Sequence, residues 1–516
     1  MNISFRPLAV RTAATALALF ALSAHAEPFS MGWKASTTAN VGTGDFAPSL
    51  IMANRAGTIT QSMGVYERAS IFKTLEPEKR FSYAFCFDGY LQAVSAVDYR
   101  RWEPQQNHFA MIPRRPAWAT LQQLYGQIKY RSLYLMAGMK EHDRTFVGNP
   151  LSSGDMTLSN NARPIPQVSI GFYDFVDIPL TKGWVEIIGD IAYGKFTDAK
   201  WNKDHYNYYN SFITTGVWYH YKRLYLRSKP EMPFSVTVGM QHAAQFGGEY
   251  TRYKDGKVEK HYQNKIDFKD FLGVFVQAQF NDSEIAGDRY NFKGNHLGSW
   301  DVKFRYRLRN NDEISFYVQK PWEDGTGIGW QNGFDGVWGL EYKAANAGWL
   351  RSVVFEYLDF TNQAGPFLHE PVPELPDNPT GADNYYNNFM YNSWVNYGMA
   401  IGNPALKSTI YNTDGYLRFT DNALWGFHLG ADGSVGNVDW KLLLSWKKSK
   451  GAFGYPRVKK VQSTSMALGA VYNIPKVKGL KLDAQAGFDA GDLYPSNFGV
   501  LVSLSYEGLI KFKKGK

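Results

Sequence analysis

Cysteine is almost absent from this chain, which has 516 residues and a single cysteine. One thiol can form no internal disulfide and cannot supply a cysteine-rich metal site. Charged residues are also scarce, at 20% of the chain, whereas hydrophobic residues make up 44%. That balance excludes a disordered, solvating chain. The 33 Tyr, 34 Phe and 15 Trp residues favour an all-β protein, because aromatic side chains are enriched in strands.

Catalytic signatures are missing as well. The sequence has no Gly-x-Ser-x-Gly nucleophile elbow. The pair His369-Glu370 is followed by Pro371, so it cannot be the helical zinc motif, which needs two histidines one turn apart. The glycine-rich residues 42–47 precede Pro48 in a strand-like context and lack the helix that would bind a dinucleotide. We expect no catalytic residue, no metal site and no cofactor, although a hydrolase built from scattered Ser, His and Asn residues stays an alternative.

The N-terminus has the pattern of a cleavable signal peptide. Arg6 and Arg11 precede an apolar run at residues 13–22, and Ala24-His25-Ala26 forms a small-x-small cleavage site. The apolar run is too short to span a bilayer as a helix. We therefore expect residues 1–26 to be removed and residues 27–516 to form one exported domain. Export also argues against nucleic acid as a partner.

Alternation of apolar and polar residues is the dominant pattern of the mature chain. It recurs at residues 123–130, 437–447 and 480–489, in stretches of about 9 or 10 residues, near the ~9–11 that a tilted strand needs to cross a bilayer. Soluble sheets typically use ~5–6 residues per strand. The clearest example sets Trp300, Val302, Phe304, Tyr306 and Leu308 against Asp301, Lys303, Arg305 and Arg307. The pattern favours a transmembrane antiparallel β-barrel over a soluble β-sandwich or propeller.

The connections fit the same architecture. Short links are expected at residues 130–132 and 309–313, and long excursions at 140–166, 320–338 and 359–404. Short turns on the periplasmic side and long extracellular loops are typical of outer-membrane barrels, and the length allows roughly 16–20 strands. Residues 498–506 have the alternation of a closing strand. Residues 102–124, which contain three prolines, are the least strand-like early segment, and we place them on the periplasmic side.

Four loop-like segments, at residues 148–166, 294–301, 321–338 and 383–404, mix aromatic rings with Asn, Asp or Glu. Rings can stack on the C–H faces of sugars, while carboxylates and amides accept hydrogen bonds from hydroxyls. Turn residues and interfacial aromatics of an ordinary barrel are the alternative interpretation. The residues that we expect to bind polysaccharide are Asn161, Arg163, Trp322, Glu323, Asp324, Trp330, Asp335, Trp338, Asn384, Tyr385 and Tyr386.

These segments resemble, in the same order, the Wzi family of capsule-assembly proteins. The resemblance is carried by Ser-Asn-Asn-Ala-Arg-Pro-Ile-Pro (159–166), His-Leu-Gly-Ser-Trp-Asp (296–301), Trp-Glu-Asp-Gly-Thr-Gly (322–327), Asp-Asn-Tyr-Tyr-Asn (383–387) and Ile-Gly-Asn-Pro (401–404). It covers nearly the whole mature chain. It implies an outer-membrane barrel of about 18 strands. It further implies a lectin that holds capsular polysaccharide or exopolysaccharide at the cell surface, rather than making or hydrolysing it.

Two functions are therefore weighed. The first is retention of polysaccharide by a monomeric barrel in the lipid of the cell outer membrane, with the lumen occluded by inward-folded loops. The second is a sugar-selective porin that uses the same aromatics as a stacking track. The full chain has a formal net charge of +9, and removal of Arg6 and Arg11 with the signal peptide leaves +7, a basic balance that favours an anionic glycan.

Overall fold

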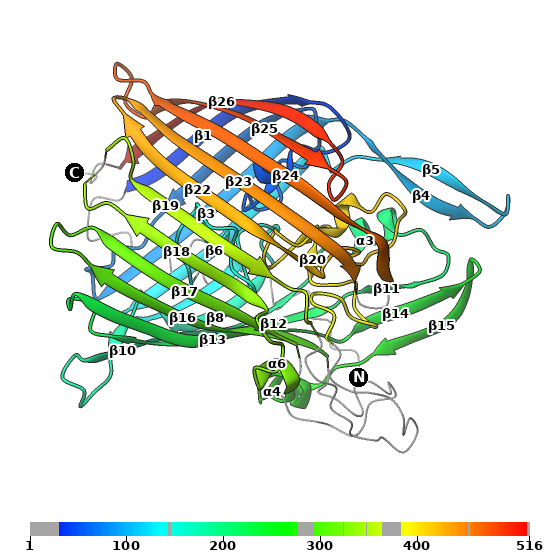
Figure 1. The fold of residues 1–516 in the computed structure, drawn as a ribbon, viewed down its shortest axis with the longest axis horizontal. Coiled ribbons are helices and arrows are strands. Elements are labelled where there is room, and N and C mark those ends of the chain that lie inside the picture. Colours follow the sequence, from blue (N-terminus) through cyan, green and yellow to red (C-terminus); the bar gives the residue numbers. More distant parts are fainter. Residues whose placement is uncertain are drawn as a thin grey trace.

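The computed structural model describes residues 30–142, 146–276, 294–323, 325–346, 348–363, 383–452 and 455–512. The predicted signal peptide, residues 1–26, lies outside the described residues. Within these ranges, no helix combines the length and the apolar character needed to span a membrane. Antiparallel strands dominate the fold and wind into one tilted barrel (Figure 1).

The barrel wall is closed. β1 pairs antiparallel with β2 on one side and with the last strand, β26, on the other, from Ser30 opposite Lys511 to Gly42 opposite Gly499. β8 and β9 both pair with β10 and share one position, so the wall is an 18-stranded barrel, as predicted. The wall strands are β1 (Ser30–Gly42), β2 (Gly64–Lys73), β3 (Phe81–Val94), β6 (Ala119–Tyr130), β7 (Leu133–Met139), β8 (Gln167–Phe172), β9 (Val176–Asp177), β10 (Val185–Lys195), β12 (Trp218–Ser228), β13 (Phe234–Phe246), β16 (Asn295–Arg307), β17 (Glu313–Trp322), β18 (Gly336–Lys343), β19 (Ser352–Asp359), β22 (Leu424–Val435), β23 (Val438–Ala452), β24 (Tyr455–Asn473), β25 (Leu480–Gly491) and β26 (Asn497–Lys511).

Smaller elements lie in the connections at one end of the barrel. β4 and β5 form one hairpin, β14 and β15 form another with β11 beside it, and β20 and β21 form a short third pair. Their bounds are β4 (Val97–Glu103), β5 (His108–Arg114), β11 (Phe212–Thr215), β14 (Gly248–Lys254), β15 (Lys257–Asn264), β20 (Val395–Asn396), β21 (Met399–Ala400), α2 (Ser49–Met52), α3 (Ala199–His205), α4 (Phe268–Val276), α6 (Gly325–Ile328) and η1 (Thr409–Tyr411).

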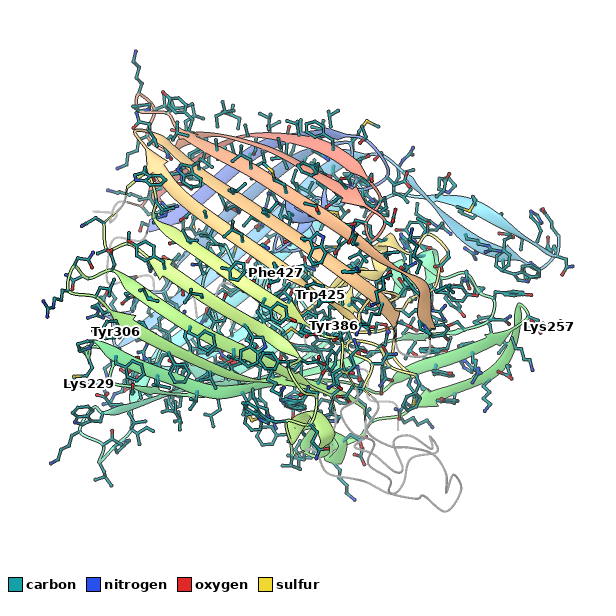
Figure 2. The ribbon with its side chains drawn as sticks, viewed as in Figure 1. Lys229, Lys257, Tyr306, Tyr386, Trp425 and Phe427 are labelled. Atoms are coloured by element: carbon teal, nitrogen blue, oxygen red, sulfur yellow. The ribbon has the colours of Figure 1, made fainter. Side chains whose placement is uncertain are left out.

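The predicted alternation is confirmed in the wall. In β16, Phe304 and Tyr306 are exposed on the outer face, whereas Asp301 is buried inside the barrel. Figure 2 shows Tyr306, Trp425 and Phe427 on the wall strands. Exposed apolar side chains outside and buried polar ones inside reverse the pattern of a soluble protein, as expected when hydrocarbon surrounds the wall.

The two ends of the barrel differ. The short turns lie at one end, including the predicted links at residues 130–132 and 309–313, together with the start of β1 and the end of β26 (Figure 1). Lys229 marks this short-turn end in Figure 2, and Lys257, at the tip of the β14–β15 hairpin, marks the other, long-loop end. The connection at 140–166 is confirmed between β7 and β8.

Three expectations about connections need correction. β17 continues to Trp322, opposite Gly298, so the connection predicted at 320–338 spans only residues 323–335. The connection predicted at 359–404 instead extends to residue 423, because residues 405–423 fold with it into the lumen. Residues 102–124 include part of the β4–β5 hairpin, which lies at the long-loop end, opposite the short turns. Pro104 lies in the turn of this hairpin and Pro116 lies beyond β5, and only Pro113 lies in a strand, where it is accommodated because an isolated two-stranded hairpin has only edge strands.

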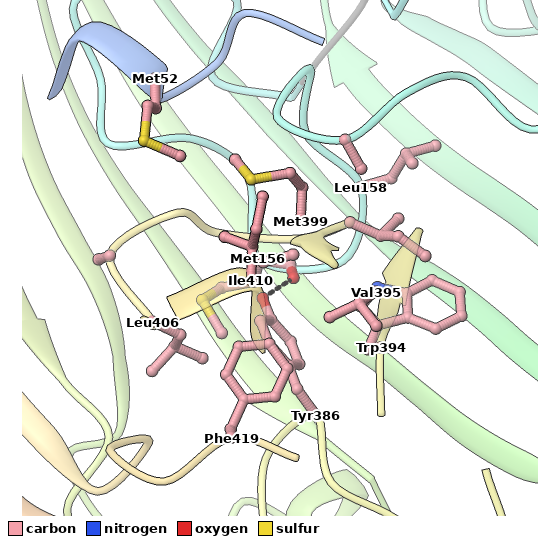
Figure 3. Close-up of a cluster of buried hydrophobic side chains, with 14 of the residues drawn as sticks. Met52, Met156, Leu158, Tyr386, Trp394, Val395, Met399, Leu406, Ile410 and Phe419 are labelled. Carbon is pink, nitrogen blue, oxygen red and sulfur yellow. Dashed lines mark hydrogen bonds between the residues drawn. The ribbon is translucent and has the colours of Figure 1, made fainter. Parts of the chain in front are cut away.

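The hydrophobic core lies inside the barrel. Connections at residues 43–63, 140–166 and 360–423 fold inward, and their apolar side chains pack with luminal wall residues into one cluster (Figure 3). We call the described parts of these three connections, apart from residues 412–418, the plug. Labelled members in Figure 3 are Met52, Met156, Leu158, Tyr386, Trp394, Val395, Met399, Leu406, Ile410 and Phe419.

Hydrogen bonds join the plug segments to one another. Asn161 donates from Nδ2 to the carbonyl of Ala400 at 2.8 Å, and Ser159 donates from Oγ to the carbonyl of Gly402 at 2.7 Å. Trp394 donates from Nε1 to the carbonyl of Thr157 at 2.9 Å. Two of the segments that resemble the Wzi family, 159–166 and 401–404, are therefore bonded to each other inside the barrel.

The filled lumen predicts low conductance in planar bilayers. Wild-type protein should conduct little, whereas replacing residues 147–165 with a short Gly/Ser linker should raise conductance severalfold, because the wall strands stay intact while part of the plug is lost. The control replaces the exposed turn at residues 104–107, at the tip of the β4–β5 hairpin, with a Gly/Ser turn and should change little. A steady, sugar-blockable conductance in the wild-type protein would contradict the occluded lumen.

Candidate functional site

The three tryptophans predicted to stack on sugar have different surroundings. Trp322 is 1% exposed and lies against the ring of His242, with centroids 5.6 Å apart and planes 8° apart. Trp338 is on the outward face of β18 and packs on Phe334, with centroids 4.7 Å apart. Trp330 is 53% exposed, with Lys320 Nζ 5.7 Å from its ring centroid. Trp322 therefore has no free face for a sugar, whereas Trp330 has one.

Two of the predicted acidic residues already accept hydrogen bonds from other residues of the chain. Glu323 accepts a hydrogen bond from the backbone N–H of Tyr386 at 2.5 Å. Asp335 is buried and accepts hydrogen bonds from Gln363 N at 2.7 Å and from the Tyr385 hydroxyl at 2.8 Å. Asp324 lies outside the described residues. The structure thus brings Glu323, Asp335, Tyr385 and Tyr386 together, in a network that attaches the 323–335 connection to the plug.

The remaining predicted residues also belong to the plug. Asn384 accepts a hydrogen bond from Asn422 Nδ2 at 2.7 Å. Asn161 is buried, and Arg163 donates to the carbonyl of Leu121 at 3.1 Å, with its guanidinium 4.2 Å from the ring centroid of Tyr397. Sugar binding by the predicted set stays a prediction, and the exposed ring of Trp330 is its most accessible part.

A different surface at the long-loop end combines aromatic rings with cations. In the β4–β5 hairpin and the adjacent connection, Trp102, Phe109 and Tyr209 contact one another, with centroids 4.7 to 5.0 Å apart. The guanidinium of Arg100 lies 3.7 Å from the ring centroid of Phe109. Alternation along the hairpin places these rings on one face.

A second group of rings involves the β14–β15 hairpin. Arg101, which alternation places on the opposite face of β4 from Arg100 and Trp102, lies 4.9 Å from the ring centroid of Tyr208, and Tyr208 contacts Tyr253 at 5.3 Å. The turn at Gly256 approaches Trp102 so closely that a Cβ there would meet the indole Nε1 at 2.0 Å. Its φ of +74° is also one that side chains rarely adopt. Glycine at this turn therefore lets the two hairpins meet.

A third group of rings lies on the adjoining 412–418 segment and the start of β24. Arg418 lies between two tyrosines, 4.5 Å from the ring centroid of Tyr416 and 4.1 Å from that of Tyr455. Tyr455 is 56% exposed. The segment is joined to the hairpin by the bond from Arg100 N to the carbonyl of Thr413, at 2.8 Å.

We call these three groups the aromatic–basic band. Its members are Arg100, Arg101, Trp102, Phe109, Tyr208, Tyr209, Tyr253, Tyr416, Arg418 and Tyr455. Sequence reasoning missed the band because its members come from five separate segments. The Tyr99-Arg100-Arg101-Trp102 run and the tyrosines at 206–209 were the available signal.

An ion-pair cluster around Asp421 joins the segment that follows Arg418 to β24. Asp421 accepts hydrogen bonds from Arg457 at 2.5 and 2.8 Å and forms an ion pair with Lys407 at 3.2 Å. Burial alone would raise its pKa, but these two cations outweigh burial and lower the pKa of Asp421 to about 2. The contact therefore ties β24 to the plug as an ion pair at every physiological pH.

A buried carboxyl in the plug behaves in the opposite way. Asp155 accepts hydrogen bonds from Phe146 N at 2.5 Å and Val147 N at 3.3 Å. Burial, together with the neighbouring Asp301, raises the pKa of Asp155 to about 7. The folded plug therefore keeps this carboxyl protonated up to about pH 7.

The chemistry available in the band is binding. Its rings can stack on sugar C–H faces, and its guanidinium groups can bind hydroxyls or carboxylates. Across the described ranges, no group of three or more His, Cys, Asp or Glu side chains is arranged to hold a metal ion.

A closed 18-stranded wall and an inward-facing core define this protein as a β-barrel of the outer-membrane type. The chain belongs to the capsule assembly protein Wzi family, whose sequence model matches residues 148–410, half of the chain. The matched region includes the plug segments 148–166 and 383–410 and most of the wall between them. The family resemblance stated from the sequence is thereby confirmed.

The fold is similar to that of Wzi from Escherichia coli, described as an outer-membrane protein involved in group 1 capsule assembly and a carbohydrate-binding β-barrel. The two share 11% sequence identity with a TM-score of 0.53, over 91% of this chain and 83% of that chain. At this identity the likeness shows the fold alone.

Weaker likenesses extend to OccK5 (OpdH) of Pseudomonas aeruginosa, with 8% identity and a TM-score of 0.43 over 93% of this chain and 98% of that one. OccAB4 of Acinetobacter baumannii has 10% identity and a TM-score of 0.43, over 94% and 99% of the two chains. No curated protein matches the sequence.

The raised pKa of Asp155 predicts pH-dependent plug stability. An unfolded Asp titrates near ~3.9, so the folded plug retains a proton that the unfolded segment loses between about pH 4 and pH 7. The free energy of opening should therefore fall across this window by up to about 1.4 kcal/mol per unit of pKa difference, and level off above it. Hydrogen exchange of residues 146–166 measures this change.

Asp155→Asn is the matched variant, because it keeps the shape and removes the titration. Its exchange protection should show no slope between pH 4 and pH 7. The same slope in wild type and variant would mean that another group is responsible.

Proposed function

We propose that this protein retains capsular polysaccharide or exopolysaccharide at the surface of the outer membrane, without making or cleaving it. The observation that carries the proposal is the pairing of a filled lumen with an aromatic–basic band outside it, at the long-loop end. Outer-membrane barrels direct their long loops to the extracellular side. The name of the family, and the carbohydrate binding described for the E. coli barrel, support the same role.

The charge of the band favours an anionic glycan. Arg100, Arg101 and Arg418 lie over aromatic rings, and none of them forms an ion pair with an acidic side chain in the described part of the chain. A guanidinium can bind a carboxylate through two parallel hydrogen bonds, while the neighbouring ring stacks on the sugar. An acidic polysaccharide would satisfy both.

The proposal also covers lipid contact and oligomeric state, and it is weighed against a second function. The exposed apolar outer wall would contact outer-membrane lipid, and the protein would act as a monomer; closure of the wall removes the strand edge through which two copies could pair. A sugar-selective porin is the second candidate function, but it needs a continuous aqueous path, and the plug fills the lumen with buried side chains.

Loss of the gene provides the cellular test. Cells without the protein should synthesise and export the same total amount of polymer but release more of it into the medium, because attachment alone is lost. Total and cell-bound polymer are measured separately after gentle centrifugation. A collapse of total production would assign the protein to synthesis or export instead.

Variants in the band test the binding surface. Arg418→Gln and Tyr455→Ala should each weaken the affinity of purified protein for acidic polymer, because each removes part of one stacked cation–ring pair. A stacking contact is worth on the order of 1 kcal/mol, which is roughly fivefold in Kd. On cells the loss would be larger, because a polymer held at many copies multiplies each contact through avidity.

One control variant and one variant of a competing site complete the test. Trp338→Ala removes an aromatic ring from the outer wall and should leave polymer affinity unchanged. Trp330→Ala tests the exposed member of the set predicted from the sequence. If Trp330→Ala abolished binding while the band variants bound normally, the binding surface would be the 323–335 connection rather than the band.

A further inference from the structure

A cavity lies inside the barrel, between the plug and strands β22 to β25. Its volume is about 320 Å³, within the ~300–1,000 Å³ typical of small-molecule sites. The plug contributes residues from 49–55, 148–154 and 404–405, and the wall contributes inward-facing side chains of β22 to β25. The cavity is separate from the aromatic–basic band.

The cavity faces the short-turn end of the barrel. Three of its wall residues, Lys441, Gly469 and Gln485, lie within a few residues of the short turns at that end. Short turns are periplasmic in outer-membrane barrels. A ligand here would therefore meet the protein from the side opposite the surface band.

The charged side chains that line the cavity are cationic. They are Arg55 from the plug, and Lys441 and Lys447 from β23, with no Asp or Glu among the described lining residues. Lys441 donates no hydrogen bond within the described part of the chain. Burial lowers the pKa of Arg55, because attraction to Asp483 compensates its desolvation only in part. Buried cations whose desolvation is only partly compensated favour the binding of an anion.

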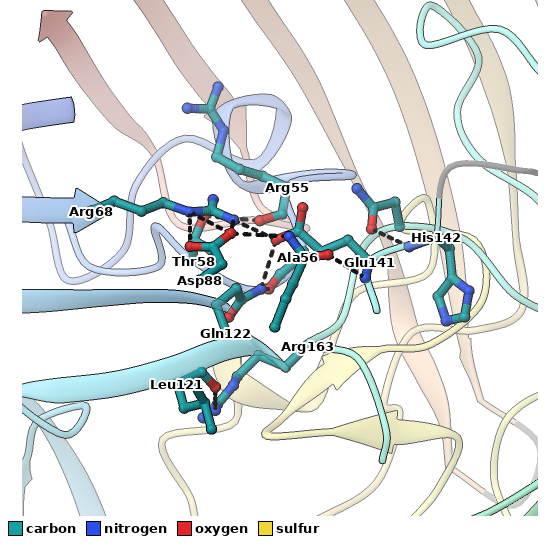
Figure 4. Close-up of polar contacts among 12 residues, drawn as sticks. Arg55, Ala56, Thr58, Arg68, Asp88, Leu121, Gln122, Glu141, His142 and Arg163 are labelled. Atoms are coloured by element: carbon teal, nitrogen blue, oxygen red, sulfur yellow. Dashed lines mark hydrogen bonds and ion pairs between the residues drawn. The ribbon is translucent and has the colours of Figure 1, made fainter. Parts of the chain in front are cut away.

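Nearby acidic groups are already engaged elsewhere. Glu141 is paired with Arg68 at 2.8 Å, and Arg68 also binds Asp88 at 2.5 Å. Figure 4 shows the Arg55 side chain directed away from this cluster. Asp489 accepts hydrogen bonds from Ser49 N at 2.7 Å and Ser49 Oγ at 2.6 Å. Asp483 attracts both Arg55 and Lys441, and Asp432 attracts Lys441, but neither acid forms an ion pair with these cations in the described part of the chain. The cations of the cavity are therefore only partly neutralised.

Uncharged polar groups line the rest of the cavity. Asn54 lines it, and its Oδ1 is buried with no hydrogen-bond donor among the described residues. Gln485 accepts a hydrogen bond from Arg55 at 2.6 Å and keeps the guanidinium in place. His428 donates from Nε2 to the Leu151 carbonyl at 2.8 Å, and its Nδ1 lies 2.7 Å from Ser445 Oγ. The Asn54 Oδ1 can accept a hydrogen bond from a sugar hydroxyl, and the cations can bind a carboxylate.

We propose that this luminal cavity binds one acidic sugar unit, with its carboxylate between Arg55 and Lys441 and its hydroxyls on the amides of the plug. The site is distinct from the surface band and does not rest on surface retention. Because Arg55 belongs to the plug and Lys441 to the wall, the bound acid also joins the two and removes the repulsion between their charges.

Titration calorimetry on the full-length, detergent-solubilised protein tests the site, with sodium glucuronate, glucose and sodium phosphate as probes. Glucuronate should bind to the wild type, and glucose should not bind at the same concentration. Lys441→Gln should weaken glucuronate binding about tenfold or more, the loss expected for one charge-assisted hydrogen bond. Lys478→Gln removes the same charge from an exposed turn and should bind as the wild type does.

Three results would overturn the proposal: no glucuronate binding, equal binding of phosphate and glucuronate, or unchanged binding in Lys441→Gln. Heat-modifiable mobility in gels reports whether each variant is folded, and Lys441→Arg, which keeps the charge, should restore binding if Lys441→Gln assembles poorly. Polymer attachment on cells is scored separately, so failure of this site leaves the surface proposal standing, and the reverse also holds.

Discussion

Closure of the wall is the constraint on which the rest of the structure depends. A strand edge in hydrocarbon leaves backbone N–H and C=O groups unpaired, at a cost of several kcal/mol each. Pairing of β1 with β26 along the whole length of β1 removes that edge. Once the wall is closed and its outer face is apolar, polar residues can face only the lumen or the two ends.

The plug is a consequence of the same constraint. A barrel of this size would enclose a wide lumen, and here three connections fill it with one hydrophobic cluster. The plug segments bind one another through buried side-chain donors and backbone carbonyls: the Asn161 amide donates to Ala400 and the Ser159 hydroxyl donates to Gly402. The plug in turn supports the aromatic–basic band, because the 412–418 segment continues from it to the surface. A rigid platform of this kind suits holding a polymer better than passing one.

Sequence patterns predicted the wall, whereas the sugar-binding residues stay a prediction, and the difference has a physical reason. Alternation is a local property, so residues 300–307 were enough to assign both faces of β16. The sugar-binding residues were chosen by composition, and aromatic rings beside carboxylates also describe a packed interior: Asp335 with Tyr385 is a buried pair rather than an open site. The band could not be read from sequence because Arg101, Tyr253 and Arg418 come from distant segments that meet only in the fold. The prolines of residues 102–124 made this segment look unlike a strand, although Pro113 lies in an edge strand, which tolerates proline.

The central claim is that polymer contacts the surface band while the plug stays closed. Hydrogen–deuterium exchange of the barrel with and without acidic polymer tests it most directly. We expect added protection at residues 97–114, 206–211, 248–264 and 412–418, with residues 146–166 and 385–406 unchanged. Protection confined to the plug, with no change in the band, would contradict the account.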